Sequence, residues 1–272
     1  MTFFYIILAT LAAGIGSVWV AAALSFGALG RYTQHMLSMA AGALLATAFM
    51  HLMPEAFESQ AGARALFATL LVGLIFFFLL DKAELWHHGH EHSHDHSNAD
   101  SNADSNDHAG HHHSDSALAH APKAGSWAIL TGDSVHCFGD GILIASAFMA
   151  DARLGWVAAL AVMAHEVPHH MGDLVALNRG SSNQRMALIK VSLAGAVTAV
   201  GGVVGFWLVD QLQDYLPYFL VVASSSFIYV ALADLIPQLQ KRLSLQQTMA
   251  QIAWLALGIL LVTWVSSFAH AL

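Results

Sequence analysis

Eight long apolar segments run through this 272-residue sequence and limit what it can fold into. A helix needs about 20 mostly apolar residues to cross a membrane. Segments of this kind occupy the windows 3–29, 35–57, 64–86, 126–150, 154–178, 186–209, 216–239 and 246–271. Because backbone exposed to lipid must satisfy its own hydrogen bonds, runs of this length favour helices over barrel strands. We therefore expect an all-α, multi-pass membrane protein with eight transmembrane helices.

The composition excludes several other classes of protein. Hydrophobic residues make up 57% of the chain and charged residues only 10%, whereas soluble domains carry about 25% charged residues. These values exclude a soluble enzyme and a nucleic-acid binder, and they leave the lipid bilayer as the expected surroundings. The single cysteine, Cys137, excludes an intrachain disulfide.

The positions of lysine and arginine predict the orientation of the chain. Cytoplasmic loops of membrane proteins are enriched in these residues. With the N-terminus outside, outer loops hold Arg64 and Arg153, and inner loops hold Arg31, Lys82, Lys123, Arg179, Arg185, Lys241 and Arg242. We therefore expect both termini outside the cytosol, in the cell (inner) membrane. The predicted organisation is helices one to three in 1–86, a cytosolic loop in 87–124 and helices four to eight in 125–272.

The loop over residues 87–124 is rich in histidine. It holds eleven of the 18 histidines of the chain, separated by a polar Ser-Asn-Ala-Asp repeat that cannot form a packed core. Imidazole binds Zn, Cu, Ni and Fe ions. We expect a disordered segment that binds transition metals. Both importers and exporters can carry such a loop, so it leaves the direction of movement open.

The fourth apolar window carries ionisable residues at membrane depth, where they are costly and usually functional. His136 and Asp140 lie four residues apart and share one face of a helix. Asp133 and Cys137 lie on or near the same stripe. These side chains predict one half of a metal site, with His136, Cys137 and Asp140 as its ligands.

The fifth window carries a matching set. His165, His169 and Asp173 repeat along one stripe, and Glu166, His170 and Asp173 occupy the adjoining stripe. Two facing helices would thus offer imidazole, carboxylate and thiolate ligands to one or two cations, a mixture that suits Zn(II) or Fe(II). Interhelical hydrogen bonds are the structural alternative, but the number of titratable side chains favours a metal site.

The second window contains a further pair of polar residues. His51 and Glu55 flank Pro54 and share a helical face. They could add a metal ligand or a relay for the ion as it leaves. Helix capping by Glu55 is the alternative interpretation, and the sequence leaves the two open.

The ligand motifs resemble those of the ZIP (Zrt/Irt-like) family of divalent-metal transporters, especially the subgroup with histidine-rich loops. The segments that carry the resemblance are His165-Glu166-Val-Pro168-His169 and His136-Cys137-Phe-Gly-Asp140-Gly141. The second segment is similar to the family's His-Asn-x-x-Asp-Gly, with Cys137 in place of asparagine. The match extends over nearly the whole chain, through the eight windows and the position of the loop.

This resemblance implies a helical bundle with inverted three-helix repeats around helices 4 and 5, often as a homodimer. It also implies a binuclear metal centre between these helices, bridged by the groups at positions 140 and 169. One metal would be bound by His136 and Asp140, and the other by Glu166 and position 137.

The leading hypothesis is therefore a carrier that moves divalent metal ions into the cytosol, with Zn(II) as the transported substrate and Fe(II), Mn(II) or Cd(II) as further candidates. We expect no enzymatic activity. The alternative is an intramembrane zinc metalloprotease, because His165-Glu166-x-x-His169 also matches the zincin pattern with Glu166 as general base. A cation-efflux carrier is a third hypothesis. Pro168 within the motif and the second ligand set on the neighbouring helix argue against the protease.

Overall fold

The computed structural model describes residues 1–25, 33–89, 126–180, 184–239 and 244–269, and these ranges are helical almost throughout, without a strand. In chain order the elements are α1 (Thr2–Leu11), η1 (Ala12–Gly16), α2 (Ser17–Ser25), α3 (Thr33–Thr47), η3 (Ala48–Leu52), α4 (Met53–Phe57), α5 (Ala63–Gly89), α6 (Ser126–Ala150), α7 (Ala152–Gly180), α8 (Gln184–Gln211), η4 (Gln213–Tyr215), α9 (Leu216–Leu239) and α10 (Leu245–Ala269). The elements η1 and η3 are single π-helical turns, and η4 is a short 3-10 turn. Each predicted window falls on one of these helical segments.

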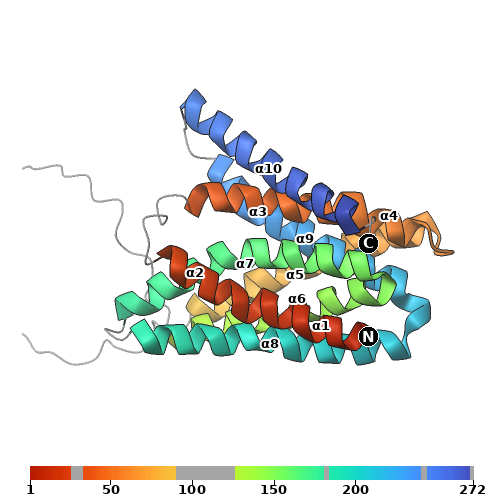
Figure 1. Cartoon of the computed structure of the whole chain (residues 1–272), viewed down its shortest axis with the longest axis horizontal. Helices are drawn as coiled ribbons and strands as arrows, with labels where there is room; N and C mark the ends of the chain where they lie inside the picture. Colours follow the sequence, from red (N-terminus) through yellow and green to blue (C-terminus); the bar gives the residue numbers. More distant parts are fainter. Residues whose placement is uncertain (26–32, 90–125, 181–183, 240–243, 270–272) are drawn as a thin grey trace, which may run out of the picture.

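Within the described ranges, six helical segments are long and apolar enough to cross a membrane. They are Thr2–Ser25, His35–Phe57, Ala63–Leu80, Gln184–Gln211, Gln213–Ala233 and Leu245–Ser267. The predicted all-α membrane fold is confirmed. The helices α6 and α7, which carry the acidic and imidazole side chains, are not among the six, so the count of eight crossings stays a prediction. The start of α1 and the end of α10 lie at the same end of the bundle (Figure 1).

The outer surface of the bundle is apolar. Only 11% of the spanning windows of α5 and α10 is buried inside the protein. Phe76 and Leu79 on α5, and Leu260 and Trp264 on α10, are each more than half exposed. Soluble proteins rarely expose continuous apolar surface of this extent. The outward faces of α5 and α10 are thus apolar, as in a multi-pass membrane protein.

The interior holds apolar clusters, one of which includes residues next to the histidines of α7. It includes Val18 on α2, Val167 and Met171 on α7, and Val191 on α8, all buried. This packing holds α2 and α8 against the part of α7 that carries histidines. It therefore fixes the rotation of α7 about its own axis.

Glycine lets α6 and α8 approach until their backbones touch. A Cβ atom on Gly141 of α6 would overlap the carbonyl oxygen of Thr198, and one on Gly201 of α8 would overlap that of Phe138. Small residues at such contacts are the usual means of close helix packing in membranes. One face of α6 is thus taken by α8, and α6 also packs against α7.

We expect Gly205→Ala to destabilise the protein by about 1–3 kcal/mol, because overpacking a tight contact forces the neighbouring backbone to move. The new Cβ would lie 2.8 Å from the Cα atom of Ile142 and 2.9 Å from the Cβ atom of Ala145. Gly172→Ala is the matched control, since Gly172 is exposed on α7 with open space at its Cβ position. Thermal unfolding in detergent should separate the two variants, and equal stability would contradict the packing of α6 on α8.

The predicted histidine-rich loop of 87–124 lies outside the described residues from position 90 onward. The helix α5 ends at Gly89 and α6 begins at Ser126, and the boundaries of the loop stay a prediction. The inverted repeats and the homodimer stay predictions.

Candidate metal centre

The predicted ligands of the fourth and fifth windows lie on α6 and α7, which pack against each other. The helix α7 continues through Pro168 from Ala152 to Gly180. Because the histidines and carboxylates are spaced by three or four residues, each helix turns one ligand-bearing face toward the other. Side chains from the two helices meet there in two groups.

The first cluster consists of His136, Asp140, His165 and Glu166. One ligand atom from each of these residues lies within 4.8 Å of the others. The Nε2 atom of His165 lies 3.2 Å from Oδ2 of Asp140 and 3.3 Å from Oε1 of Glu166. The Nε2 atom of His136 lies 3.3 Å from the same Glu166 oxygen. Two nitrogens and two carboxylates thus converge on one point.

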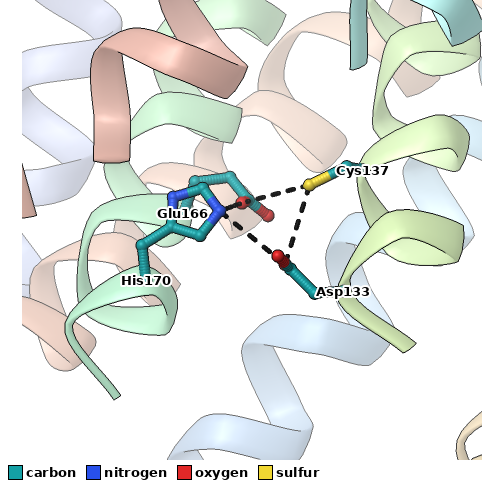
Figure 2. Close-up of side chains that lie close together, drawn as sticks. All are labelled: Asp133, Cys137, Glu166 and His170. Atoms are coloured by element: carbon teal, nitrogen blue, oxygen red, sulfur yellow. Dashed lines mark hydrogen bonds and ion pairs between the residues drawn. The ribbon is translucent and has the colours of Figure 1, made fainter. Parts of the chain in front are cut away.

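The second cluster consists of Asp133, Cys137, Glu166 and His170. Figure 2 shows the side chains from α6 and α7 pointing toward one another. The Nε2 atom of His170 lies 3.0 Å from Oε2 of Glu166 and 3.7 Å from Oδ1 of Asp133. The sulfur of Cys137 lies 3.7 Å from Oδ1 of Asp133 and 3.8 Å from Oε2 of Glu166. Glu166 therefore belongs to both clusters, with one carboxylate oxygen facing each.

Several of the buried side-chain atoms in the clusters make no hydrogen bond to a described residue. The Nδ1 atom of His165 lies 3.2 Å from the carbonyl oxygen of Ala161. When Nδ1 donates its hydrogen to that oxygen, the lone pair of Nε2 points at carboxylate oxygens. In the part of the chain that the structure describes, Oδ2 of Asp133, Oδ2 of Asp140 and Oε1 of Glu166 are buried and make no hydrogen bond. Buried lone pairs that face one another are satisfied either by a proton on an imidazole or by a metal ion between them.

Burial differs among the ligands. Cys137, Asp140, His165, Glu166 and His170 are at most 2% exposed. The side chain of His136 is 27% exposed. A cation would therefore reach the clusters from the side of His136.

Two predicted residues of α7 lie outside both clusters. His169 is exposed, and its ring stacks on that of His136 with 5.5 Å between the ring centroids. Asp173 has one buried carboxylate oxygen that makes no hydrogen bond to any described residue. The resemblance implied bridging groups at positions 140 and 169, whereas the residue common to both clusters is Glu166. The ligand roles of His169 and Asp173 stay predictions.

His51 and Glu55 lie apart from the clusters, in a cavity of about 260 Å³ that they line together with Glu58, Arg153 and Ser266. The Nδ1 atom of His51 lies 3.4 Å from the hydroxyl oxygen of Ser266. On α7, Arg153 precedes His165 by twelve residues, or about 18 Å at a rise of 1.5 Å per residue. The cavity is therefore a separate polar site toward one end of the bundle.

Asp133 is a member of the second cluster that was not among the ligands predicted from the sequence. Its place near the stripe of His136 was recognised, but it was not predicted to bind metal. Its spacing of four residues from Cys137 was the available signal, because that spacing puts both side chains on one face of α6.

The fold and the two clusters define a helical membrane protein with buried side chains that could hold metal ions. The sequence profile of the family described as ZIP Zinc transporter matches residues 1–266, and the chain belongs to this family. The predicted resemblance is thus confirmed. The family is one of transporters rather than enzymes.

Named relatives agree with this assignment. Zinc transporter foi of Drosophila melanogaster is 32% identical over 161 residues, which are 56% of this chain and 23% of that protein. Human zinc transporter ZIP4 is 38% identical over 113 residues, 42% of this chain and 17% of ZIP4. Zinc transporter ZIP13 of Pongo abelii is 24% identical over 255 residues, 87% of this chain and 68% of ZIP13. The chain thus matches less than a quarter of the length of the first two relatives.

Proposed function

We propose that this protein carries zinc ions across the membrane into the cytosol, and that the ions pass through the two clusters between α6 and α7. One observation carries the proposal: the two oxygens of the buried Glu166 carboxylate face two separate sets of ligands. Membership of the ZIP family supports transport of divalent metal ions. The site residues and the direction of movement are our proposal.

The charges of the clusters suit two divalent ions. Asp133, Asp140 and Glu166 contribute three negative charges, and Cys137 contributes a fourth as a thiolate. Two Zn(II) ions would balance these four charges, which matters because unbalanced charge inside a membrane is costly. Nitrogen, oxygen and sulfur ligands together suit zinc. Fe(II), Mn(II) and Cd(II) are further candidate substrates.

The route that we propose begins at the cavity lined by His51, Glu55 and Glu58, which places His51 and Glu55 at the entry for the ion rather than at its exit. With the termini outside, this cavity opens outward and its carboxylates attract cations. The ion then loses its water to the clusters, reached past His136. The histidines of the 87–124 loop would receive it in the cytosol.

Rocking of one group of helices against another would open the two clusters toward the cytosol. Backbone contacts at glycine join α6 with α8, and they also join α3 with α10, where a Cβ on Gly42 would overlap the carbonyl oxygen of Leu255. Each pair would move as a unit because its backbones are in contact. The group with α6 and α8 would carry the four cluster residues of α6 with it.

The protease alternative is not favoured. A zincin-type site needs both histidines of the motif on one metal and leaves the glutamate free as general base. Here His165 and Glu166 belong to the same cluster, and His169 is not part of it. The family assignment also points to transport.

Uptake into proteoliposomes tests the proposal. The purified full chain should carry Zn(II) inward more rapidly than empty liposomes do, with Mg(II) as a negative control. Low pH should slow uptake because protons compete with metal for the ligands. Absence of uptake for Zn(II), Fe(II), Mn(II) and Cd(II) would contradict the proposed function.

Cys137 should set the metal preference. Its sulfur is buried in the second cluster, where a thiolate favours Zn(II) and Cd(II) and an amide oxygen favours Mn(II). We expect Cys137→Asn to raise transport of Mn(II) or Fe(II) relative to Cd(II). Competition among these ions in the uptake assay measures the change. An unchanged order of preference among these ions would show that the Cys137 thiol is not a metal ligand and only fills space in the packed interior.

A further inference from the structure

A serine of the first helical segment contacts a ligand of the second cluster. Ser17, fully buried at the start of α2, has its hydroxyl oxygen 3.1 Å from Nδ1 of His170. The same oxygen lies 2.7 Å from the carbonyl oxygen of Gly14. Nothing in the apolar pattern of the first window marks this serine, because its partner is 153 residues away.

The two contacts of the hydroxyl decide where the imidazole carries its hydrogen. A serine hydroxyl has one hydrogen to donate. The carbonyl oxygen of Gly14 can only accept, so the hydroxyl donates to it. The serine oxygen then accepts from the Nδ1–H group of His170, which leaves a lone pair on Nε2. That atom lies 3.0 Å from Oε2 of Glu166 and makes no hydrogen bond to any described residue (Figure 2).

His165 shows the same arrangement, but its support comes from its own helix. Its Nδ1 atom faces the carbonyl oxygen of Ala161, one turn earlier on α7. His170 instead depends on a residue from another helix. Histidines that bind metal commonly donate their second ring N–H to such a partner, which fixes the ring and its ligating nitrogen.

The position of Ser17 is itself fixed by packing. A Cβ on Gly14 would overlap the carbonyl oxygen of Gly195, so η1 lies directly against α8. Val18, the next residue, is buried in the apolar cluster that includes Val167 and Met171 of α7. Val167 and Met171 lie before and after His170 on α7. The packing of Val18 in the same cluster therefore holds the neighbouring Ser17 hydroxyl beside His170.

We propose that Ser17 is a positioning residue for the second metal position. It holds His170 with the hydrogen on Nδ1, so that Nε2 binds the metal beside Cys137, Asp133 and Glu166. The first helical segment thereby becomes part of the metal centre. This inference rests on the proposed function, because it takes the second cluster to bind metal.

The single cysteine of the chain gives a direct test. Cd(II) bound to the Cys137 thiolate absorbs in the ultraviolet, and this signal reports the second position alone. We would titrate the purified full chain with Cd(II) and follow both this absorbance and the heat of binding. Ser17→Ala should move the midpoint of the absorbance to roughly 10–100-fold higher Cd(II), as loss of an outer-sphere partner does. Binding at the first cluster should be unchanged.

Ser146→Ala is the matched control. Ser146 is equally buried, and its hydroxyl donates to the carbonyl oxygen of Ile142 in its own helix. This variant should keep the wild-type midpoint. A wild-type midpoint in Ser17→Ala, or equal weakening of both positions, would overturn the positioning role and leave the proposed function standing. If the wild-type chain itself shows no cadmium–thiolate absorbance, the second metal position and this inference fail together.

Discussion

We expect the substitution Glu166→Gln to abolish zinc uptake. The carboxylate faces Nε2 of His136 and His165 with one oxygen and Nε2 of His170 with the other. Its loss therefore removes a ligand from both metal positions at once. Since loss of an outer-sphere partner alone costs roughly 10–100-fold, we expect the uptake rate to fall by more than about 100-fold. Uptake into proteoliposomes at matched protein amounts measures the effect.

Asp210→Asn is the control for removal of a carboxylate. Asp210 is exposed near the end of α8 and belongs to neither cluster. This variant should transport zinc at the wild-type rate. If Glu166→Gln takes up zinc at the wild-type rate, the clusters do not lie on the transport route.

The second prediction separates the two metal positions. Asp140 belongs only to the first cluster and Asp133 only to the second. Asp140→Asn should therefore bind one zinc ion fewer than the wild-type chain and keep the cadmium–thiolate absorbance of Cys137. Asp133→Asn should also bind one zinc ion fewer but lose this absorbance at the same Cd(II) concentration.

Both variants should transport zinc slowly, because each leaves one of the two positions weakened. Isothermal titration of the full chain in detergent gives the number of ions bound. If each variant still binds as many zinc ions as the wild-type chain, with wild-type affinity, the division into two clusters is wrong.

Much of the fold could be predicted because apolar length and helical period are local properties of the sequence. The fourth window coincides with α6 and the seventh with α9. The π-helical turns η1 and η3 were not predicted, since one extra residue in a turn leaves the apolar pattern almost unchanged. Their position near Ser17 and Pro54 is a feature that only the structure reveals.

The site could be predicted in part. Spacing alone placed His136 with Asp140, and it also placed Glu166 with His170. Spacing could not show which ligands share a cluster, because that depends on how far α7 is rotated about its axis relative to α6. The packing of Val167 and Met171 sets that rotation, and it brings Glu166 between the clusters while His169 stays exposed.

Anomalous X-ray scattering from crystals of the zinc-bound protein tests the central claim most directly. We predict two zinc peaks between α6 and α7, about 3.5–4 Å apart as in other two-metal sites. One oxygen of Glu166 should contact each peak. Zinc found only beside His51 and Glu55, with none between α6 and α7, would contradict the account.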